Sequence, residues 1–287
     1  MTIKNVAVVG AGVMGSGIAQ VTAAAGFKVM LIGKDASLTR AIGSVENNLI
    51  RMVNKGIVKE KEKTKILSRI MMSSRLNSVK DSQLVIECVP ELIKLKVETF
   101  KQLESICPPE TIYASNSSTI PISLLASATS RPAQVIGTHF MNPVPLMKGV
   151  EIIASEHTSR RTIQVVEQFI REIGKEPCEA KDRPGFIVSR LVCVLMNEAI
   201  RCVMDGNQPE EVDKAMRLCC NFPVGPLELC DLIGSDVVMQ CLETMEKELG
   251  RRVAPCLLLK SQVRSRKLGR KTGKGFYNYQ VNNGEQK

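Results

Sequence analysis

His139 is the residue of this chain best suited to proton transfer. It follows the apolar run Val135–Thr138, at the expected end of a buried strand, whereas the other histidine, His157, lies in a polar loop and is expected at the surface. Imidazole titrates near neutral pH, which suits a base that takes a proton from an alcohol. Glu151 lies early in the next expected strand, and if the two strands are neighbours its carboxylate would orient and stabilise an imidazolium. The alternative is a packed histidine that ends a strand.

Asn116 and Ser118 are candidates for hydrogen bonds to a substrate oxygen. They follow the expected strand Ile112–Ser115, so they lie at the end of the strand unit that precedes His139. The alternative is ordinary capping of a loop, since Ser and Asn are common in turns.

A glycine-rich loop near the start of the chain has the pattern of a dinucleotide site. The apolar run Val6–Val9 leads into GAGVMG at Gly10–Gly15, and a helix of small residues is expected after it. In this pattern the first glycine allows a tight turn, the second lets the backbone approach a pyrophosphate, and the third lets helix and strand pack closely. The alternative is a glycine-rich loop with no ligand. The candidate cofactor contacts in the loop are Gly10, Gly12, Val13, Met14 and Gly15.

Gly33 and Lys34 stand where the fingerprint places the ribose of the cofactor. The second expected strand, Lys28–Ile32, ends at these residues. An acidic residue near this point binds the 2′-hydroxyl of NAD, whereas a basic neighbour suits the 2′-phosphate of NADP. Gly33 and Lys34, with Arg40 nearby, favour NADP, but Asp35 is placed to favour NAD. The sequence therefore leaves both cofactors open.

Two basic helices are expected after this strand. Ser37 can cap the first, whose apolar residues recur every three or four positions, and Gly56 would end it. A second helical stretch runs to about Arg69, and its other cations are Lys59, Lys61, Lys63 and Lys65. These cations suit either a solvated surface or the phosphate groups of a ligand.

Strand-like runs alternate with helical patterns through the first part of the chain. The further expected strands are Leu84–Glu87, Ile112–Ser115, Val135–Thr138 and Val150–Ala154. This alternation predicts an α/β fold, a Rossmann-like doubly wound parallel sheet with helices on both faces and the helix pair as an insertion. Ligands of such sheets bind beyond the carboxyl ends of the strands. This rule places Glu91, Asn116, Ser118 and His139 along one edge.

From Pro184 onward, long helical patterns replace the strand-like runs. The expected helices are Ile187–Val203, Pro209–Leu218, Asp236–Leu249 and Pro255–Val263. The break predicts a dinucleotide-binding domain, residues 1–182, followed by an all-α domain, residues 183–287. Apolar helices of this length often bury a face against a second subunit, so we expect a homodimer or a higher homo-oligomer.

Composition argues against several classes of protein. Trp is absent, aromatic residues make up 3% of the chain, and no motif that reads DNA or RNA is present, so nucleic acid is not an expected partner. The net charge of +10 instead suits a polyanionic small substrate or a solvated basic surface, and we favour the substrate. No apolar run approaches the roughly 20 residues of a membrane span, and the start lacks the layout of a signal peptide. The ten cysteines are scattered, which favours free thiols in a cytoplasmic enzyme over disulfides or a metal site.

Six segments together resemble one enzyme family. They are GAGVMGSGIAQ at the start, ASNSS at 114–118, HFMNPVP at 139–145, PGFIVSR at 184–190, VGPLEL at 224–229 and GRKTGKGFYNY at 269–279. The chain is similar to the short-chain 3-hydroxyacyl-CoA dehydrogenases, in particular the bacterial 3-hydroxybutyryl-CoA dehydrogenases. The resemblance covers nearly the whole chain, and the combined motifs are far more specific than the glycine loop alone.

The resemblance implies a role for each matching residue. His139 matches the general base, Glu151 its acidic partner, and Ser118 the serine that hydrogen-bonds the substrate oxygen. Asn142 looks like a support for the catalytic geometry, and Lys55 resembles the lysine that meets coenzyme A, which favours phosphate binding by the basic helices. The residues at cofactor-contacting positions are Glu91, Lys96, Asn116 and Lys271.

Two positions depart from the family pattern. The family usually has Asp where Gly33 stands, so a preference for NAD does not carry over. It usually has Asn, which helps hold the substrate, where Ser189 stands. The shorter Ser189 implies a bond through water, reduced activity or a different acyl group.

The expected function is interconversion of a short 3-hydroxyacyl-CoA and the 3-oxoacyl-CoA with NAD(H) or NADP(H). One alternative is an enzyme of the same architecture acting on a hydroxy acid without coenzyme A, against which Lys55 and the basic helices argue. Another, suggested by Ser189, is a cofactor-binding protein with reduced turnover.

Overall fold

The computed structural model describes residues 2–279. The chain divides into two compact units, with the boundary between Arg183 and Pro184. The sequence places this boundary one residue earlier, after Asp182.

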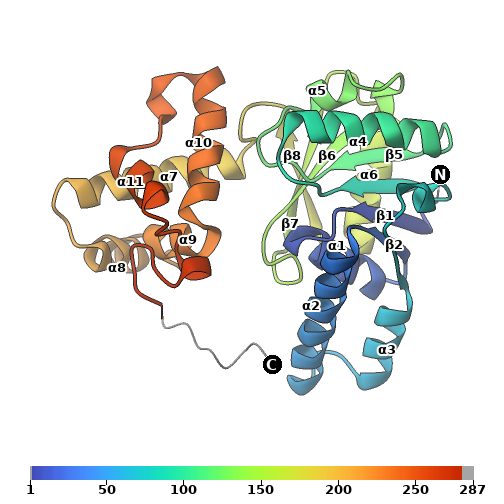
Figure 1. Ribbon diagram of the computed structural model, residues 1–287, viewed down its shortest axis with the longest axis horizontal. Coiled ribbons are helices and arrows are strands. Elements are labelled where there is room, and N and C mark those ends of the chain that lie inside the picture. The colour runs from blue at the N-terminus through green and yellow to red at the C-terminus, as the bar shows by residue number, and fades with distance from the viewer. Residues whose placement is uncertain (1, 280–287) are drawn as a thin grey trace. The chain divides into compact units, whose positions relative to one another are not determined.

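The described part of the first unit contains one eight-stranded sheet, in the order β3-β2-β1-β4-β5-β6-β7-β8 (Figure 1). Its strands are β1 (Asn5–Val9), β2 (Lys28–Ile32), β3 (Ile70–Ser73), β4 (Leu84–Glu87), β5 (Ile112–Ser115), β6 (Val135–Phe140), β7 (Gly149–Ala154) and β8 (Glu176–Lys181). Neighbouring strands from β3 to β6 pair in parallel, β7 is antiparallel to β6, and β8 is parallel to β7. The β-branched, apolar runs of the central strands suit a sheet that is covered on both faces.

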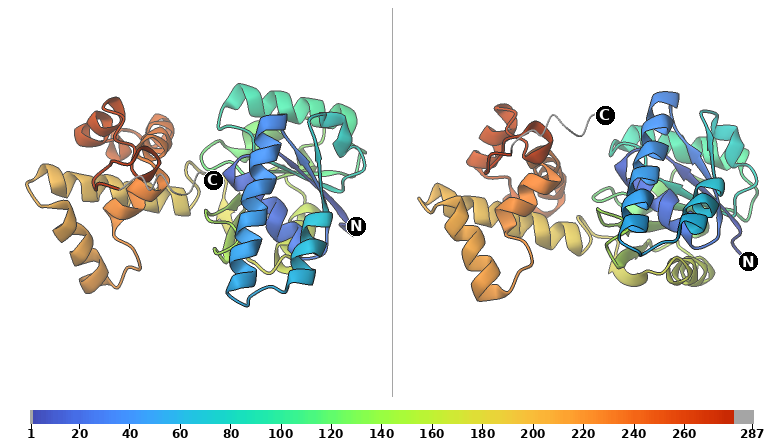
Figure 2. Two further views of the ribbon diagram at one scale, coloured as in Figure 1. Left: turned by 60° about the horizontal axis from the view of Figure 1, so that its bottom comes forward. Right: turned by 90° about the horizontal axis from the view of Figure 1, so that it is seen from below.

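Helices cover both faces of this sheet (Figure 2). They are α1 (Val13–Ala24), α2 (Asp35–Asn54), α3 (Glu60–Ser68), α4 (Ile93–Ile106), α5 (Ile122–Ala126) and α6 (Arg160–Glu172), with the short 3₁₀ helices η1 (Leu76–Val79) and η2 (Pro132–Gln134). Helices α2 and α3 form the expected insertion, between β2 and β3.

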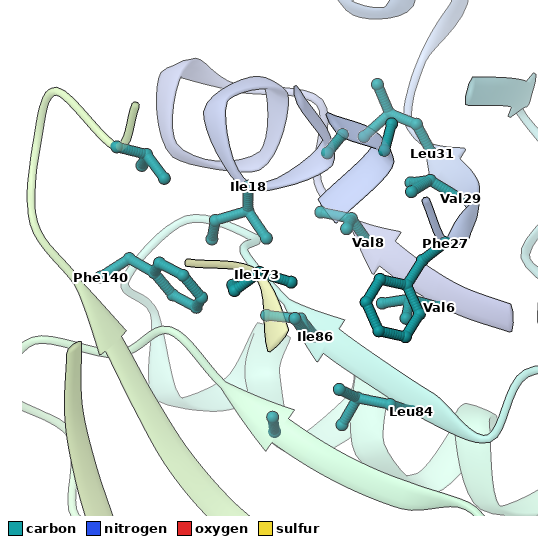
Figure 3. Close-up of a cluster of buried hydrophobic side chains, with 14 of the residues drawn as sticks. Val6, Val8, Ile18, Phe27, Val29, Leu31, Leu84, Ile86, Phe140 and Ile173 are labelled. Carbon is teal, nitrogen blue, oxygen red and sulfur yellow. The ribbon is translucent and has the colours of Figure 1, made fainter. Parts of the chain in front are cut away.

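The main core lies between the sheet and helices α1, α2 and α6. Figure 3 shows its centre, where apolar side chains of β1, β2 and β4 gather with Ile18 of α1. Phe27 packs edge-on against Phe169 of α6, with ring centroids 5.3 Å apart. On the opposite face, Tyr113 of β5 packs against Phe100 of α4, because successive strand residues point to opposite sides.

Three details of the first unit differ from the sequence-based expectation. The sheet is mixed, since β7 runs against β6. Strands β3 and β8 were not expected. The prediction that Ser37 caps a helix is wrong, because α2 begins at Asp35 after Lys34, whereas its end before Gly56 is confirmed.

The second unit is all-helical in its described part. Its helices are α7 (Val188–Met204), α8 (Pro209–Cys220), α9 (Pro226–Ile233), α10 (Ser235–Leu249) and α11 (Leu257–Arg264), with the 3₁₀ helices η3 (Arg251–Val253) and η4 (Arg270–Thr272). Helix α9 was not expected, and buried Asp213 of α8 holds its start by accepting N–H hydrogen bonds from Leu227 and Glu228. Among residues 2–279, no helix combines the length and apolarity needed to cross a bilayer.

Candidate active site

Strand pairing brings the ends of four parallel strands to one level. Val9 of β1 lies opposite Glu87 of β4, which lies opposite Ser115 of β5, which in turn lies opposite Gly137 of β6. The segments that follow these residues therefore share the carboxyl edge of the sheet, where ligands of open α/β sheets bind. The glycine loop, Asn116, Ser118 and His139 all emerge at this edge.

The geometry of the glycine loop fits a dinucleotide. Gly10 has φ +117°, and its N–H bonds the carbonyl of Ile32 at 2.8 Å. A methyl group at Gly10 would collide with the carbonyl of Cys88, and one at Gly15 would collide with the carbonyl of Gly10, so both glycines are needed for the turn itself. At Gly12 a methyl group would meet nothing within 4 Å.

The N-terminus of α1 is open to an anion. Gly12 caps the helix and supplies no side-chain hydrogen bond, and the first turn carries no acidic residue. Val13, in that turn, is 74% exposed, whereas Met14 packs partly against the core. The first-turn N–H groups and the helix dipole suit the pyrophosphate of a nicotinamide dinucleotide.

His139 and Glu151 form a buried pair across β6 and β7. The two residues lie opposite each other in the antiparallel register. Nδ1 of His139 lies 2.7 Å from Oε2 of Glu151, and the side chains are 6% and 3% exposed. A carboxylate in this place accepts a hydrogen bond from Nδ1–H, which fixes the tautomer with Nε2 as the basic nitrogen and stabilises an imidazolium. His157 lies elsewhere, half exposed beside Glu156.

Asn116 joins the end of β5 to the end of β6. Its side-chain oxygen accepts a hydrogen bond of 2.9 Å from the N–H of Phe140, the residue after His139. The amide therefore fixes the backbone that carries the imidazole.

Glu91 organises the turn that carries Ser118. One of its carboxylate oxygens accepts the N–H of Ser118 at 2.9 Å and the N–H of Thr119 at 3.1 Å, together with the hydroxyl of Ser117. Within residues 2–279, the hydroxyl of half-buried Ser118 makes no hydrogen bond, so it can donate to a ligand oxygen.

Lys96 lies beneath this turn, 1% exposed, between two carboxylates. Its Nζ lies 2.8 Å from Glu87 and 3.2 Å from Glu91, and it also bonds the carbonyl of Val89. Burial alone would lower the pKa of Lys96, but the two carboxylates outweigh it and raise the pKa. The structure thus places Lys96 as the cation that holds Glu91.

Glu87 belongs to the same hydrogen-bonded cluster, and the sequence-based analysis missed it. Its side chain is fully buried and accepts hydrogen bonds from Lys96, the N–H of Val89 and the hydroxyl of Ser115. The available signal was a carboxylate that ends an otherwise apolar strand, which requires a buried partner.

The segment after β6 returns to α1. A methyl group at Gly17 would lie 2.9 Å from Cβ of buried Val144, so this glycine allows the close approach. Asn142 precedes a cis peptide bond to Pro143, and its side chain is exposed.

The remaining site candidates are described within their own units. In the first unit, Lys34 is exposed at the end of β2, and Lys55 is exposed at the end of α2. In the second unit, Ser189 is buried in the first turn of α7, and Lys271 pairs with Asp236. Among residues 2–279, no group of three or more His, Cys, Asp and Glu side chains is arranged to hold a metal ion.

Comparison with known proteins assigns both units. Residues 5–183 match the model of the 3-hydroxyacyl-CoA dehydrogenase NAD binding domain, and residues 185–279 match that of the 3-hydroxyacyl-CoA dehydrogenase C-terminal domain. A probable 3-hydroxybutyryl-CoA dehydrogenase of Bacillus subtilis is 42% identical over 283 residues, which is 98% of this chain and 99% of that protein.

Solved structures agree with these matches. FadB2 of M. tuberculosis superposes with a TM-score of 0.95 at 38% identity, covering 97% of this chain and 100% of that one. The (S)-3-hydroxybutyryl-CoA dehydrogenase PaaH1 of Ralstonia eutropha gives a TM-score of 0.92 at 40% identity, covering 97% and 99%. The chain therefore belongs to the 3-hydroxyacyl-CoA dehydrogenase family.

Proposed function

We propose that this protein interconverts short-chain (3S)-3-hydroxyacyl-CoA and 3-oxoacyl-CoA, with 3-hydroxybutyryl-CoA and acetoacetyl-CoA as the substrate pair. The carrying observation is the buried His139–Glu151 pair, which stands at the same edge of the sheet as the glycine loop. The printed names of the B. subtilis and R. eutropha relatives support the choice of acyl group.

In the oxidation direction, Nε2 of His139 takes the proton of the 3-hydroxyl group. At the same time the hydride leaves C3, the carbon that bears this hydroxyl, and the C=O bond forms. The bound nicotinamide supplies the hydride acceptor, or the donor in reverse. Glu151 stabilises the imidazolium that results. During reduction His139 returns the proton to the substrate oxygen and becomes neutral again. The Ser118 hydroxyl donates a hydrogen bond to the substrate oxygen, which strengthens as that oxygen gains charge.

Four further residues position these groups. Asn116 holds the backbone after His139, and Glu91 holds the turn of Ser118. Lys96 keeps Glu91 ionised and in place, so we assign all three a positioning role at the cofactor edge. Asn142, on the segment that contacts α1, supports the same geometry.

Other residues bind the parts of the ligands that lie away from the reacting carbon. Lys55, exposed after the end of α2, attracts the phosphates of coenzyme A together with the exposed Lys59, Lys61 and Lys65 at and after the start of α3, since nearby cations raise the local concentration of an anionic ligand. For Ser189 and Lys271 we keep the roles that the family resemblance implies, contact with the substrate and contact with the cofactor.

We further propose a homodimer formed through the second unit and a cytoplasmic location. Leu191, Leu218 and Leu257 of this unit are 65%, 75% and 74% exposed, and a second subunit packed on these helices would cover them. None of the ten cysteines, all within residues 2–279, forms a disulfide, as expected for a reducing compartment.

Initial rates with acetoacetyl-CoA, longer 3-oxoacyl-CoA homologues and free acetoacetate, each with NADH and NADPH, test this function. We expect kcat/KM to be highest for acetoacetyl-CoA and far lower for the free acid. Equal kcat/KM for thioester and free acid would favour a hydroxy-acid dehydrogenase that does not use coenzyme A. Binding of both nucleotides without turnover of any thioester would instead indicate a protein that has lost catalysis, with Ser189 as the first residue to restore to Asn.

A further inference from the structure

We propose that Lys34 and Arg75 bind the 2′-phosphate of NADP(H), so that this enzyme prefers NADPH to NADH. The inference rests on the proposed function, because it concerns the cofactor of the same reaction. Lys34 follows β2, and Arg75 follows β3.

Strand pairing brings these two residues to one place. β2 and β3 are parallel, Ile32 lies opposite Ser73, and the N–H of Gly33 bonds the carbonyl of Ser73 at 3.2 Å. The segments beyond both strands therefore leave the sheet side by side, at its carboxyl edge. The glycine loop adjoins them, since the N–H of Gly10 bonds the carbonyl of Ile32.

Gly33 removes the group that would bind the 2′-hydroxyl of NAD. In dinucleotide sites this position supplies a carboxylate for the ribose. A Cβ at Gly33 would lie 2.6 Å from Cβ of Ala11, so the backbone here packs directly on the glycine loop and leaves no room for a side chain without a shift. Position 33 therefore contributes no carboxylate that would repel a phosphate.

The charge around this point is positive. Lys34 and Arg75 are exposed, and neither forms an ion pair with another residue of the described part of the chain. The hydroxyl of Ser73 accepts the N–H of Arg75 at 3.1 Å and bonds the hydroxyl of Ser78 at 2.8 Å, which fixes the backbone at Arg75. A guanidinium and an ammonium are the donors that bind phosphate most strongly.

Asp35 is the acidic residue next to this pair. It is exposed in the first turn of α2, beside Lys34. Its carboxylate would favour NAD over NADP, because it would accept a hydrogen bond from the 2′-hydroxyl of NAD and repel a 2′-phosphate. The balance of two cations against one carboxylate favours the phosphate.

Calorimetric titration with 2′,5′-ADP and with 5′-AMP tests the proposal without turnover. We expect the wild-type protein to bind 2′,5′-ADP at least about tenfold more tightly than 5′-AMP, the gain typical of a hydrogen bond to a charged group. Lys34→Ala and Arg75→Ala should each weaken 2′,5′-ADP about tenfold and leave 5′-AMP unchanged. Lys28→Ala is the matched control, since this exposed lysine begins β2 at the opposite edge of the sheet.

Three outcomes would overturn the proposal: equal affinity for the two fragments, unchanged binding of 2′,5′-ADP in both variants, or equal weakening in Lys28→Ala. A loss of NADH binding in Asp35→Asn would show that Asp35 reads the ribose instead. Each of these results is distinct from failure of the proposed function, in which acetoacetyl-CoA is not reduced with either nucleotide. Because both cations are exposed, their replacement should leave the melting temperature unchanged, and a circular dichroism melt checks this.

Discussion

Gly17 of α1 touches Val144 of the segment that follows β6, and a methyl group at residue 17 would lie 2.9 Å from the Cβ of Val144. Helix α1 begins at the glycine loop, and β6 ends beside His139. The contact therefore couples the helix at the proposed dinucleotide site to the strand that carries the proposed base. A hydride transfer is sensitive to such a spacing, because a misplacement of about 1 Å can cost roughly 10²-fold in rate.

Gly17→Ala should lower both stability and turnover. The added methyl group forces Val144 and its backbone outward, and overpacking of this kind costs about 1–3 kcal/mol of unfolding free energy. Gly43→Ala is the control: it lies within α2, its methyl group would meet nothing within 4 Å, and the substitution should raise stability by about 0.5–1 kcal/mol. Urea unfolding and initial rates measure both. A stabilised Gly17→Ala protein with normal kcat would contradict the coupling.

His139→Ala should reduce kcat by about 10²–10⁴-fold, the usual contribution of a positioned acid–base group. Glu151→Gln keeps an oxygen that can accept the Nδ1 proton but removes the charge, so we expect a smaller loss of kcat with little change in KM. His157→Ala is the control, because that side chain is 51% exposed. Steady-state kinetics of acetoacetyl-CoA reduction separate the three variants, and near-normal turnover of His139→Ala would exclude this mechanism.

The sequence predicts the central strands well because each is a short β-branched run with buried side chains. It misses β3 and β8, which lie at the two ends of the sheet. Edge strands are covered less, so Met71 and Met72 are exposed in β3, and β8 carries Pro177 among charged residues. The apolar run of β3 is limited to Ile70–Met72, without the β-branched pattern of the central strands, and β8 has none.

Side-chain contacts between different elements are harder to predict from the sequence than the placement of residues at the carboxyl edge of the sheet. The sequence places His139 and Glu151 on successive strands, but their contact depends on β7 turning back against β6, and strand direction is not encoded in the strand's own pattern. Similarly, Glu87 and Lys96 are visible as charges near apolar residues. Only the path of α4 across the sheet determines that one neutralises the other.

Lys96→Met should destabilise the protein by about 3–5 kcal/mol, because it leaves the buried carboxylate of Glu87 without its counter-charge. Lys94→Met, two residues earlier on the exposed side of α4, should change stability by less than about 0.5 kcal/mol. Urea unfolding of both variants measures the difference. Equal, small effects would mean that the Lys96 ammonium does not hold the two carboxylates together.

Stability should depend on pH through Glu91. Burial alone would raise the pKa of Glu91, but Lys96 and the hydrogen bonds of Ser117, Thr119 and Ser118 outweigh it, so the pKa lies below the usual 4.5. A depressed pKa contributes stability that is present above pH 4.5 and is lost as the pH falls through the folded value.

Urea unfolding of the wild type and Glu91→Gln between about pH 3 and about pH 7 checks this sign. We expect the wild type to be more stable near neutrality and the difference to shrink in acid. A difference that stays constant across this range would show that the Glu91 carboxylate contributes no charge-dependent stability.

Lys96 acts at the alkaline end of the pH range. Because its pKa is raised, the stability that its charge contributes is fully present below pH 10.5 and is lost only above it.

Substitutions at Gly12 and Gly15 distinguish the loop's role in binding the dinucleotide from its role in folding. A methyl group at Gly12 meets open space, and the backbone there, with φ −85° and ψ −169°, is one that alanine adopts readily. Gly12→Ala should therefore melt like the wild type but bind NADH and NADPH much more weakly, because its methyl group occupies the place where the pyrophosphate approaches the backbone. Gly15→Ala places its methyl group on the carbonyl of Gly10, so it should lose both stability and binding. Thermal melts and fluorescence titration with the reduced nucleotides distinguish the two variants, and unimpaired binding by Gly12→Ala would remove the glycine loop as the cofactor site.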